Sequence, residues 1–261
     1  MLRSLSTAAT GMMAQQTNID VISNNLANVN TTGFKKSRAE FQDLLSQTLK
    51  APGAQVAQGT FQPTGIQVGL GVKNSAIQRV NTDGIMKTTD NPTSVAISGE
   101  GFFQIQMDDG SIAYTRDGSF KVDANGQLVT SDGYQVIPQV TIPQDATQIS
   151  ITAGGKVTVQ QPGTAELTEV GTIELVRFAN PGGLLAAGKN LLLETGASGT
   201  PVQGIANQEG FGSIEQGFLE GSNVQVVEEL INLISAQRAF EANSNVIRAS
   251  DEALQTANRL V

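Results

Sequence analysis

The sequence contains no cysteine, histidine or tryptophan, and each absence excludes a class of function. Without cysteine there is no disulfide and no thiolate nucleophile, and without histidine there is no Ser-His-Asp triad. The same two absences remove the imidazole and thiolate ligands of zinc sites, so we expect no catalytic residue, no metal and no cofactor. Charge is scarce as well, because only 15% of the 261 residues are charged.

Basic residues are fewer than acidic ones, 16 against 24, and the net charge is −8. An acidic chain is a poor partner for nucleic acid, whose backbone selects a basic face. No hydrophobic run approaches the length of a membrane span. The first residues lack the continuous apolar segment of a secretory signal, since polar residues interrupt it at 15–18. We therefore expect any export to occur without a cleaved signal peptide.

The C-terminal residues 223–261 contain an apolar residue at every seventh position and neither glycine nor proline. This spacing predicts a long helix that packs along one seam. Ser222 or Asn223 is expected to cap its start. The apolar row consists of Val226, Leu233, Phe240, Ile247, Leu254 and Val261. A second row, three residues further on, is small or polar and consists of Ala236, Asn243, Ser250 and Ala257.

Residues 1–33 show the same pattern, and it stops at an Asn- and Gly-rich segment at 28–33. The apolar row here consists of Leu5, Met12, Ile19 and Leu26. Gly11 interrupts the helical segment at a cost of about 1 kcal/mol relative to alanine. Two seams of matching period predict that the ends pair as coiled-coil-like helices; the alternative is two ordinary amphipathic helices on one globular core. The nearly uncharged remainder of 1–33 favours burial against copies of the chain, and hence an assembly interface.

Residues 76–222 are predicted to form a β-rich domain, so the fold class is α+β with a mostly antiparallel sheet. Short β-prone runs alternate with residue pairs that favour tight hairpin turns. The pairs are Asp109-Gly110, Asp117-Gly118, Asn125-Gly126 and Asp132-Gly133. Residues 34–75 are predicted to be an extended linker region that contributes edge strands.

Three short motifs carry weak chemical signals, and we interpret each as structural. Residues 183–190 nearly match a phosphate-binding loop, but Asn190 replaces the hydroxyl residue and no long helix follows. The adjacent Asp108 and Asp109 could act as paired carboxylates, yet Asp109 is needed by a turn. Residues 123–126 resemble a fragment of a calcium loop without its later bidentate glutamate.

Lys35, Lys36 and Arg38 form a short basic cluster after the first helical segment. One interpretation is a solvated face. The other is an inter-subunit electrostatic contact, in which the cluster meets the acidic middle region of a neighbouring copy.

The segment 22–35 resembles the N-terminal signature of bacterial flagellar axial proteins, the rod, hook and hook-associated proteins. The residues that carry this family signature are Asn24, Asn25, Leu26, Ala27, Asn28, Thr31, Gly33 and Phe34. Residues 228–244 are similar to the closing helix of the same family. The rod branch is matched best, through the segments 8–12, 20–22, 41–45, 63–72 and 216–224.

The resemblance implies a non-enzymatic subunit of a helical homopolymer, exported unfolded through the flagellar type III apparatus. It implies that the terminal helices line a channel, that residues 34–75 stiffen the shaft and that the β domain faces outward. The implied partners are the chain itself, other rod proteins, the hook protein, and the periplasmic and outer-membrane ring proteins. Two alternatives stay open: another axial protein, namely a proximal rod or short hook subunit, and a secreted β-rich carbohydrate-active enzyme or lectin.

Overall fold

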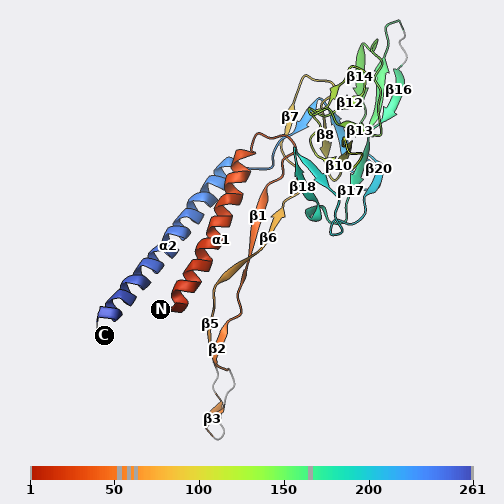
Figure 1. The fold of residues 1–261 in the computed structure, drawn as a ribbon. Helices are drawn as coiled ribbons and strands as arrows, with labels where there is room; N and C mark the ends of the chain where they lie inside the picture. The colour runs from red at the N-terminus through yellow and green to blue at the C-terminus, as the bar shows by residue number, and fades with distance from the viewer. Residues whose placement is uncertain (1, 52–54, 58–59, 62–63, 164–166, 260–261) are drawn as a thin grey trace. The chain divides into compact units, whose positions relative to one another are not determined.

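A computed structural model describes residues 2–51, 55–57, 60–61, 64–163 and 167–259 (Figure 1). The chain forms two compact units, the first made of Met1–Ala27, Ser37–Gln78 and Gln225–Val261, and the second of Asn28–Lys36 and Arg79–Val224. The division expected from the sequence was different, because it grouped 28–33 with the helices and treated 34–75 as a separate linker. The prediction of an α+β fold, with terminal helices around a central antiparallel β domain, is confirmed.

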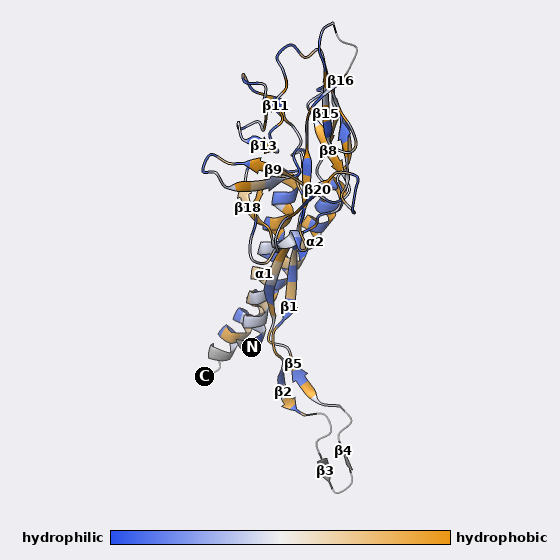
Figure 2. Cartoon of the chain, turned by 90° about the vertical axis from the view of Figure 1, so that its right-hand side faces the viewer, coloured by the Kyte–Doolittle hydropathy of each residue, from blue (hydrophilic) through white to orange (hydrophobic). Residues whose placement is uncertain are grey.

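The first unit is built on two long helices, α1 (Leu2–Ala27) and α2 (Val226–Arg259), which lie side by side and antiparallel (Figure 1). Each ends close to the position expected from its sequence. α1 stops before the Asn- and Gly-rich segment, as predicted. Among the described residues, no helix is both long enough and apolar enough to span a membrane. Figure 2 shows both helices as a mixture of hydrophilic and hydrophobic residues along their length.

The expected cap of α2 is wrong. The first turn closes when the Glu229 amide donates to the Gln225 carbonyl at 3.0 Å, so the helix begins beyond Ser222 and Asn223. The Ser222 hydroxyl accepts from the Val224 amide at 3.2 Å, still ahead of the helix. The Asn223 side chain instead donates to the Val80 carbonyl at 2.9 Å, a contact within the second unit.

The remainder of the first unit consists of paired strands. β1 (Ser37–Asp43) pairs with β6 (Val72–Arg79), β2 (Gln47–Lys50) with β5 (Ile66–Val68), and β3 (Gln55–Ala57) with β4 (Thr60–Phe61). Residues 34–75 thus form strand pairs in their described part. α1 packs against β1, and the Asn74 amide of β6 also donates to the Thr17 hydroxyl of α1 at 2.7 Å. Helix α1 therefore contacts both α2 and the strand β1.

In its described part, the second unit contains a nine-stranded sheet whose neighbouring strands pair antiparallel. Its main path runs β11 (Lys121–Val122), β12 (Leu128–Val129), β13 (Gln135–Ile137), β9 (Phe102–Gln106), β10 (Ile112–Thr115), β19 (Leu191–Leu193) and β18 (Leu185–Gly188). Off this path, β17 (Glu174–Arg177) pairs with both β9 and β20 (Val202–Ile205).

Smaller sheets complete the second unit. Three strands form one sheet in the order β14 (Gln148–Ile151), β15 (Lys156–Gln160) and β16 (Leu167–Thr172). Two pairs join distant parts of the chain, β21 (Ser213–Gln216) with β8 (Val95–Ser98) and β22 (Phe218–Glu220) with β7 (Met86–Thr88). A short 3₁₀ helix, η1, covers Pro181–Gly183.

A dense apolar core holds these sheets together. Phe103 and Phe120 are essentially fully buried, and their rings meet edge-on with centroids 5.1 Å apart. Edge-to-face packing of this kind adds to the stabilisation that comes from burial alone. Aliphatic residues from the nine-stranded sheet, the three-stranded sheet and the β8–β21 pair belong to the same core, and the strands carry much of the hydrophobic colour in Figure 2. The second unit therefore has a core of its own.

Three of the four predicted turn pairs behave as expected, with Gly110, Gly126 and Gly133 at positive φ. Asp117-Gly118 does not close a hairpin, because β10 pairs with β9 and β19 and not with β11. A Cβ at Gly118 would stand 1.7 Å from the Val95 carbonyl oxygen, so this glycine permits a close approach of two backbones.

Residues of the three weak chemical motifs lie at turns. Residues 185–190 form β18 and the turn into β19, with Lys189 and Asn190 at positive φ. Asp109 lies at the tip of the β9–β10 hairpin and accepts from the Ser111 amide at 2.9 Å. In the calcium-like segment, Asp123 accepts from the Gln127 amide at 2.7 Å. Each motif is thus engaged in shaping a turn.

Candidate assembly surface and the signature turn

The two predicted seams lie on the helix pair, but their large apolar residues are not the most buried part of it. Leu5, Met12, Ile19 and Leu26 on α1 are half-buried, as are Leu233, Phe240, Ile247 and Leu254 on α2. Val226 is 42% exposed, and Val261 lies outside the described residues. The pairing of the helices is observed, whereas their coiled-coil character stays a prediction.

The tightest contacts between the helices use a different row, whose residues are small or polar. We call this row the polar seam; on α2 it consists of Glu229, Ala236, Asn243 and Ser250. Ala236 is 3% exposed and Ser250 is 9% exposed. The hydroxyls of Ser4 and Ser250 lie 3.4 Å apart. The helices thus meet along the row that the sequence placed three residues after the large apolar one.

Large apolar side chains stay uncovered on the first part of α2. Val227 is 71% exposed, Ile231 61% and Ile234 50%. Met13 on α1 is 60% exposed. Exposed apolar side chains that gather on one element of a folded chain are typical of surfaces that bind another macromolecule. We call Val227, Leu230, Ile231, Ile234 and Val246 the apolar face of α2.

Within the family signature, Asn25 is the best-supported structural residue. Its side chain is 2% exposed and forms two hydrogen bonds with the backbone of Ser37, the first residue of β1. The Asn25 amide donates to the Ser37 carbonyl at 2.8 Å, and its oxygen accepts from the Ser37 amide at 2.9 Å. It also donates to Glu229 at 3.4 Å. One buried side chain therefore joins α1, β1 and α2 within the first unit.

The signature continues as a turn in the second unit. The Asn28 carbonyl accepts from the Thr31 amide at 3.1 Å, and the two side chains are hydrogen-bonded at the same distance. Gly33 has a φ of 68°, and a Cβ there would stand 2.7 Å from the Asp117 amide nitrogen. Only glycine suits both the left-handed conformation and this close approach. Phe34 follows half-buried, and its amide donates to the Thr31 carbonyl at 3.4 Å.

Lys35 requires a correction, because it does not belong to an exposed basic cluster. Its side chain is 4% exposed and forms an ion pair with Glu220, which is fully buried. Its ammonium also donates to the Thr82 carbonyl at 2.6 Å. Desolvation lowers the pKa of the Lys35 ammonium, and the attraction of Glu220 opposes this shift. Lys35 is therefore engaged inside its own chain and is not available for a neighbouring copy.

Glu220 gathers further groups of the second unit around it. The Arg116 guanidinium lies 3.4 Å from Oε2 of Glu220, and the Gly84 amide donates at 3.0 Å to Oε1, the oxygen that pairs with Lys35. The Gly33 amide donates to the Glu220 backbone carbonyl at 2.8 Å. Four segments far apart in the sequence thus meet at one buried carboxylate.

The other two residues of the basic cluster have surroundings that differ from those of Lys35. Arg38 is in β1 of the first unit, with a side chain that is 68% exposed and 3.4 Å from Glu40. Lys36 belongs to the second unit, where its backbone amide donates to the Asn223 side chain at 2.7 Å.

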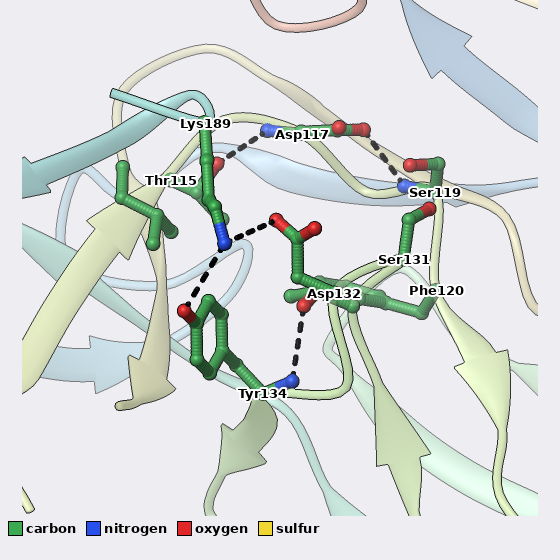
Figure 3. A pocket seen from close by; sticks show the side chains of 10 residues that line it. Thr115, Asp117, Ser119, Phe120, Ser131, Asp132, Tyr134 and Lys189 are labelled. Atoms are coloured by element: carbon green, nitrogen blue, oxygen red, sulfur yellow. Dashed lines mark hydrogen bonds and ion pairs between the residues drawn. The ribbon is translucent and has the colours of Figure 1, made fainter. Parts of the chain in front are cut away.

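A small pocket of the second unit was not indicated by the sequence (Figure 3). It is lined by polar side chains, and Lys189 there lies 3.3 Å from the Tyr134 hydroxyl and 3.7 Å from Asp132. Its volume of about 40 Å³ is far below the several hundred cubic ångströms of typical ligand pockets. Across the described ranges, no group of three or more acidic residues is placed to hold a metal ion.

Comparison with known proteins gives matches along most of the chain. The model of a flagella basal body rod protein matches residues 5–35. The flagellar hook protein FlgE/F/G D1 domain matches residues 96–159, and the flagellar basal body rod FlgEFG protein C-terminal matches 215–260. These three regions hold the signature, the centre of the β unit and α2.

Full-length relatives agree with these matches. The flagellar basal-body rod protein FlgG of Borreliella burgdorferi is 51% identical, with 100% of this chain and 99% of that protein covered. The protein of the same name from Caulobacter vibrioides is 48% identical, with 99% of each chain covered. That of Bacillus subtilis is 43% identical, with 98% and 97% covered. The chain belongs to the family of flagellar basal-body rod proteins.

Proposed function

We propose that this rod protein polymerises helically into the distal part of the hollow shaft that carries torque from the flagellar motor to the hook. The observation that carries the proposal is the apolar face of α2. Val227 and Ile231 are 71% and 61% exposed although α2 is already paired with α1. The helix pair therefore satisfies its internal contacts and still offers apolar surface to a further copy.

The energetics favour such a contact. Burying one large aliphatic side chain contributes about 1.5–3 kcal/mol, so a few residues of this face suffice to stabilise an interface. A surface that meets a different surface on the next copy, through a rotation that does not close, builds an open helical filament. The half-buried rows that contain Leu26 and Phe240 extend the same helix pair and are proposed to take part in the interface.

Several finer features belong to the same proposal. The subunit is exported through the type III apparatus and has no enzymatic role. In the assembled rod it meets other rod proteins, the hook protein and the ring proteins. Arg38 and Lys36 remain the candidates for an electrostatic contact with an acidic neighbouring copy. Removing both charges is expected to raise the polymerisation threshold less at high salt than at low salt.

The deciding experiment is electron microscopy of the purified full-length chain at increasing concentration. We expect tubes with a central channel, and a chain that stays monomeric and compact at high concentration would contradict the proposal. Leu26→Asp and Phe240→Asp are expected to prevent tube formation, because burying a charge in an apolar contact costs several kcal/mol.

The apolar face has its own matched test. Ile231→Asp is expected to abolish tubes while the free chain keeps its fold, because this side chain is 61% exposed. Gln237→Asp, an exposed polar position on the same helix, introduces the same charge and is the control. Tubes of normal length from Ile231→Asp would show that the apolar face is not part of the interface.

A further inference from the structure

The polar seam between α1 and α2 contains one contact that differs from the rest. A Cβ added at Gly11 would stand 2.9 Å from the Asn243 amide nitrogen and 3.2 Å from its Cγ. The end of the Asn243 side chain therefore lies where a Cβ at position 11 would stand, and it would have to shift to admit one. Gly11 is the only glycine in the sequence of α1, and the sequence of α2 contains none.

The neighbouring contacts of the seam step regularly along both helices. Ser4 meets Ser250 and Asn25 meets Glu229, each at 3.4 Å. The Gly11–Asn243 contact falls between them, seven residues from Ser4 on α1 and seven from Ser250 on α2. The two helices thus keep one antiparallel register over most of α1.

The large apolar residues cannot select this register by themselves. Their rows repeat every seven residues on both helices, so a slide by one repeat again places apolar side chains opposite apolar side chains. Such a slide would bring the Asn243 side chain opposite Ser4 or Asn18 instead of Gly11. Each of those positions carries a side chain, so the amide would lose its space.

We propose that Asn243, seated against Gly11, sets the register of α1 against α2. A single polar residue in a helical seam is a well-attested way of fixing register. The register decides which residues of α1 lie at each level of α2. The inference rests on the proposed function and deepens it, because each copy would enter the assembly with its two helices in one fixed alignment. Glycine at position 11 lowers the helix propensity of α1, and the contact with Asn243 that it permits would fix one alignment of the two helices.

The chain has no cysteine of its own, so pairs of introduced cysteines report the register directly. Ser4→Cys with Ser250→Cys reports the observed register, since these hydroxyls lie 3.4 Å apart. Ser4→Cys with Asn243→Cys removes the amide and reports a slide by one repeat. In the observed register that second pair is separated by about 10 Å along the helix axis, too far for a disulfide.

The measurement is the yield of crosslinked full-length chain on non-reducing gels, together with helix content from circular dichroism. We expect the Ser4–Ser250 pair to crosslink in the presence of Asn243. Adding Asn243→Ala should lower that yield about tenfold with little loss of helix. Without the amide contact, α1 can slide along α2 by one repeat, and the two cysteines then no longer face each other. The Ser4→Cys and Asn243→Cys pair, tested as a separate variant that also lacks the amide, should crosslink. Asn245→Ala, an exposed asparagine on the same helix, is the control and should leave the yield unchanged.

The outcomes separate this inference from the proposed function. An unchanged Ser4–Ser250 yield in the Asn243→Ala chain would overturn the role of Asn243, even if tubes form normally. A loss of helix in that chain would also overturn it, because the residue would then support stability and not register. If the wild-type chain forms no tubes yet shows the expected crosslinks, the register holds and the proposed function fails.

Discussion

The two units of this chain differ in how their apolar residues are packed. In the second unit Phe103, Ile105 and Leu175 are fully buried in a large continuous core. In the first unit the buried residues of the helices are mostly small or polar, while Val227 and Ile231 on α2 remain exposed. A unit with its apolar residues inside is stable by itself. A unit with many of them outside reaches its full stability only when something covers them.

Both tyrosines, Tyr114 and Tyr134, lie in the second unit, whereas the two long helices belong to the first. Tyrosine circular dichroism and helical circular dichroism of one sample therefore report the two units separately. A substitution that affects only one unit should therefore shift one of the two signals more than the other.

The largest effect is expected at the buried carboxylate. Glu220→Ala removes a fully buried charge that pairs with Lys35 and Arg116, and leaves two buried cations without it. Breaking a buried ion pair in this way costs about 3–5 kcal/mol. In urea unfolding the tyrosine signal should shift strongly and the helical signal should shift less. Glu215→Ala, an exposed glutamate of β21, is the matched control, and equal shifts in both variants would contradict the role of Glu220.

A smaller effect is expected at Asn25, in the first unit. Asn25→Ala leaves both backbone groups of Ser37 without their side-chain partner, which costs about 1–3 kcal/mol where the groups stay buried. The helical signal should now shift more than the tyrosine signal. Faster hydrogen exchange at the Ser37 amide would locate the change. Gln16→Ala, at an exposed position of α1, should leave that exchange rate unaltered.

The smallest effect is expected at the tip of the β9–β10 hairpin. Hydrogen bonds from Ser111 hold the pKa of Asp109 below its ordinary value of 3.8. The carboxylate form therefore stabilises the fold above that pH, and this contribution is lost as the pH falls through the lowered pKa. Asp109→Asn should flatten the acid side of the tyrosine-monitored stability profile slightly, because the group is fully exposed. Asp108→Asn is the control for the change in charge, and an identical profile in both variants would refute the assignment.

Local pattern was sufficient to predict much of the architecture. The helices, the hairpin tips at Gly110 and Gly133, and strands such as Phe102–Gln106 follow from periodicity and turn chemistry alone. The prediction of a hairpin turn at Asp117-Gly118 was wrong. Its glycine is needed for a close approach to the backbone of the distant strand β8, and not for a turn between neighbouring strands. A turn signal and a close-approach glycine look the same in one sequence.

The site was predicted less completely, for a related reason. Lys35 looks like part of a solvated run until its partner is known, and Glu220 lies 185 residues away. The available signal was a lone acidic residue among glycine and large apolar residues at 217–221. Gly11 was counted only as a weakness of its helix, since nothing local reveals that Asn243 fills the space beside it. Long-range pairs of this kind depend on the fold.

The antiparallel helix pair has a practical consequence for labelling. Because Ser4 and Ser250 lie together, the start of α1 and the end of α2 emerge at the same end of the pair (Figure 1). A fluorescent or affinity fusion at either terminus would therefore crowd the same place. The exposed hairpin tip around Gly110, where an added Cβ meets nothing within 4 Å, is the better position for a reporter.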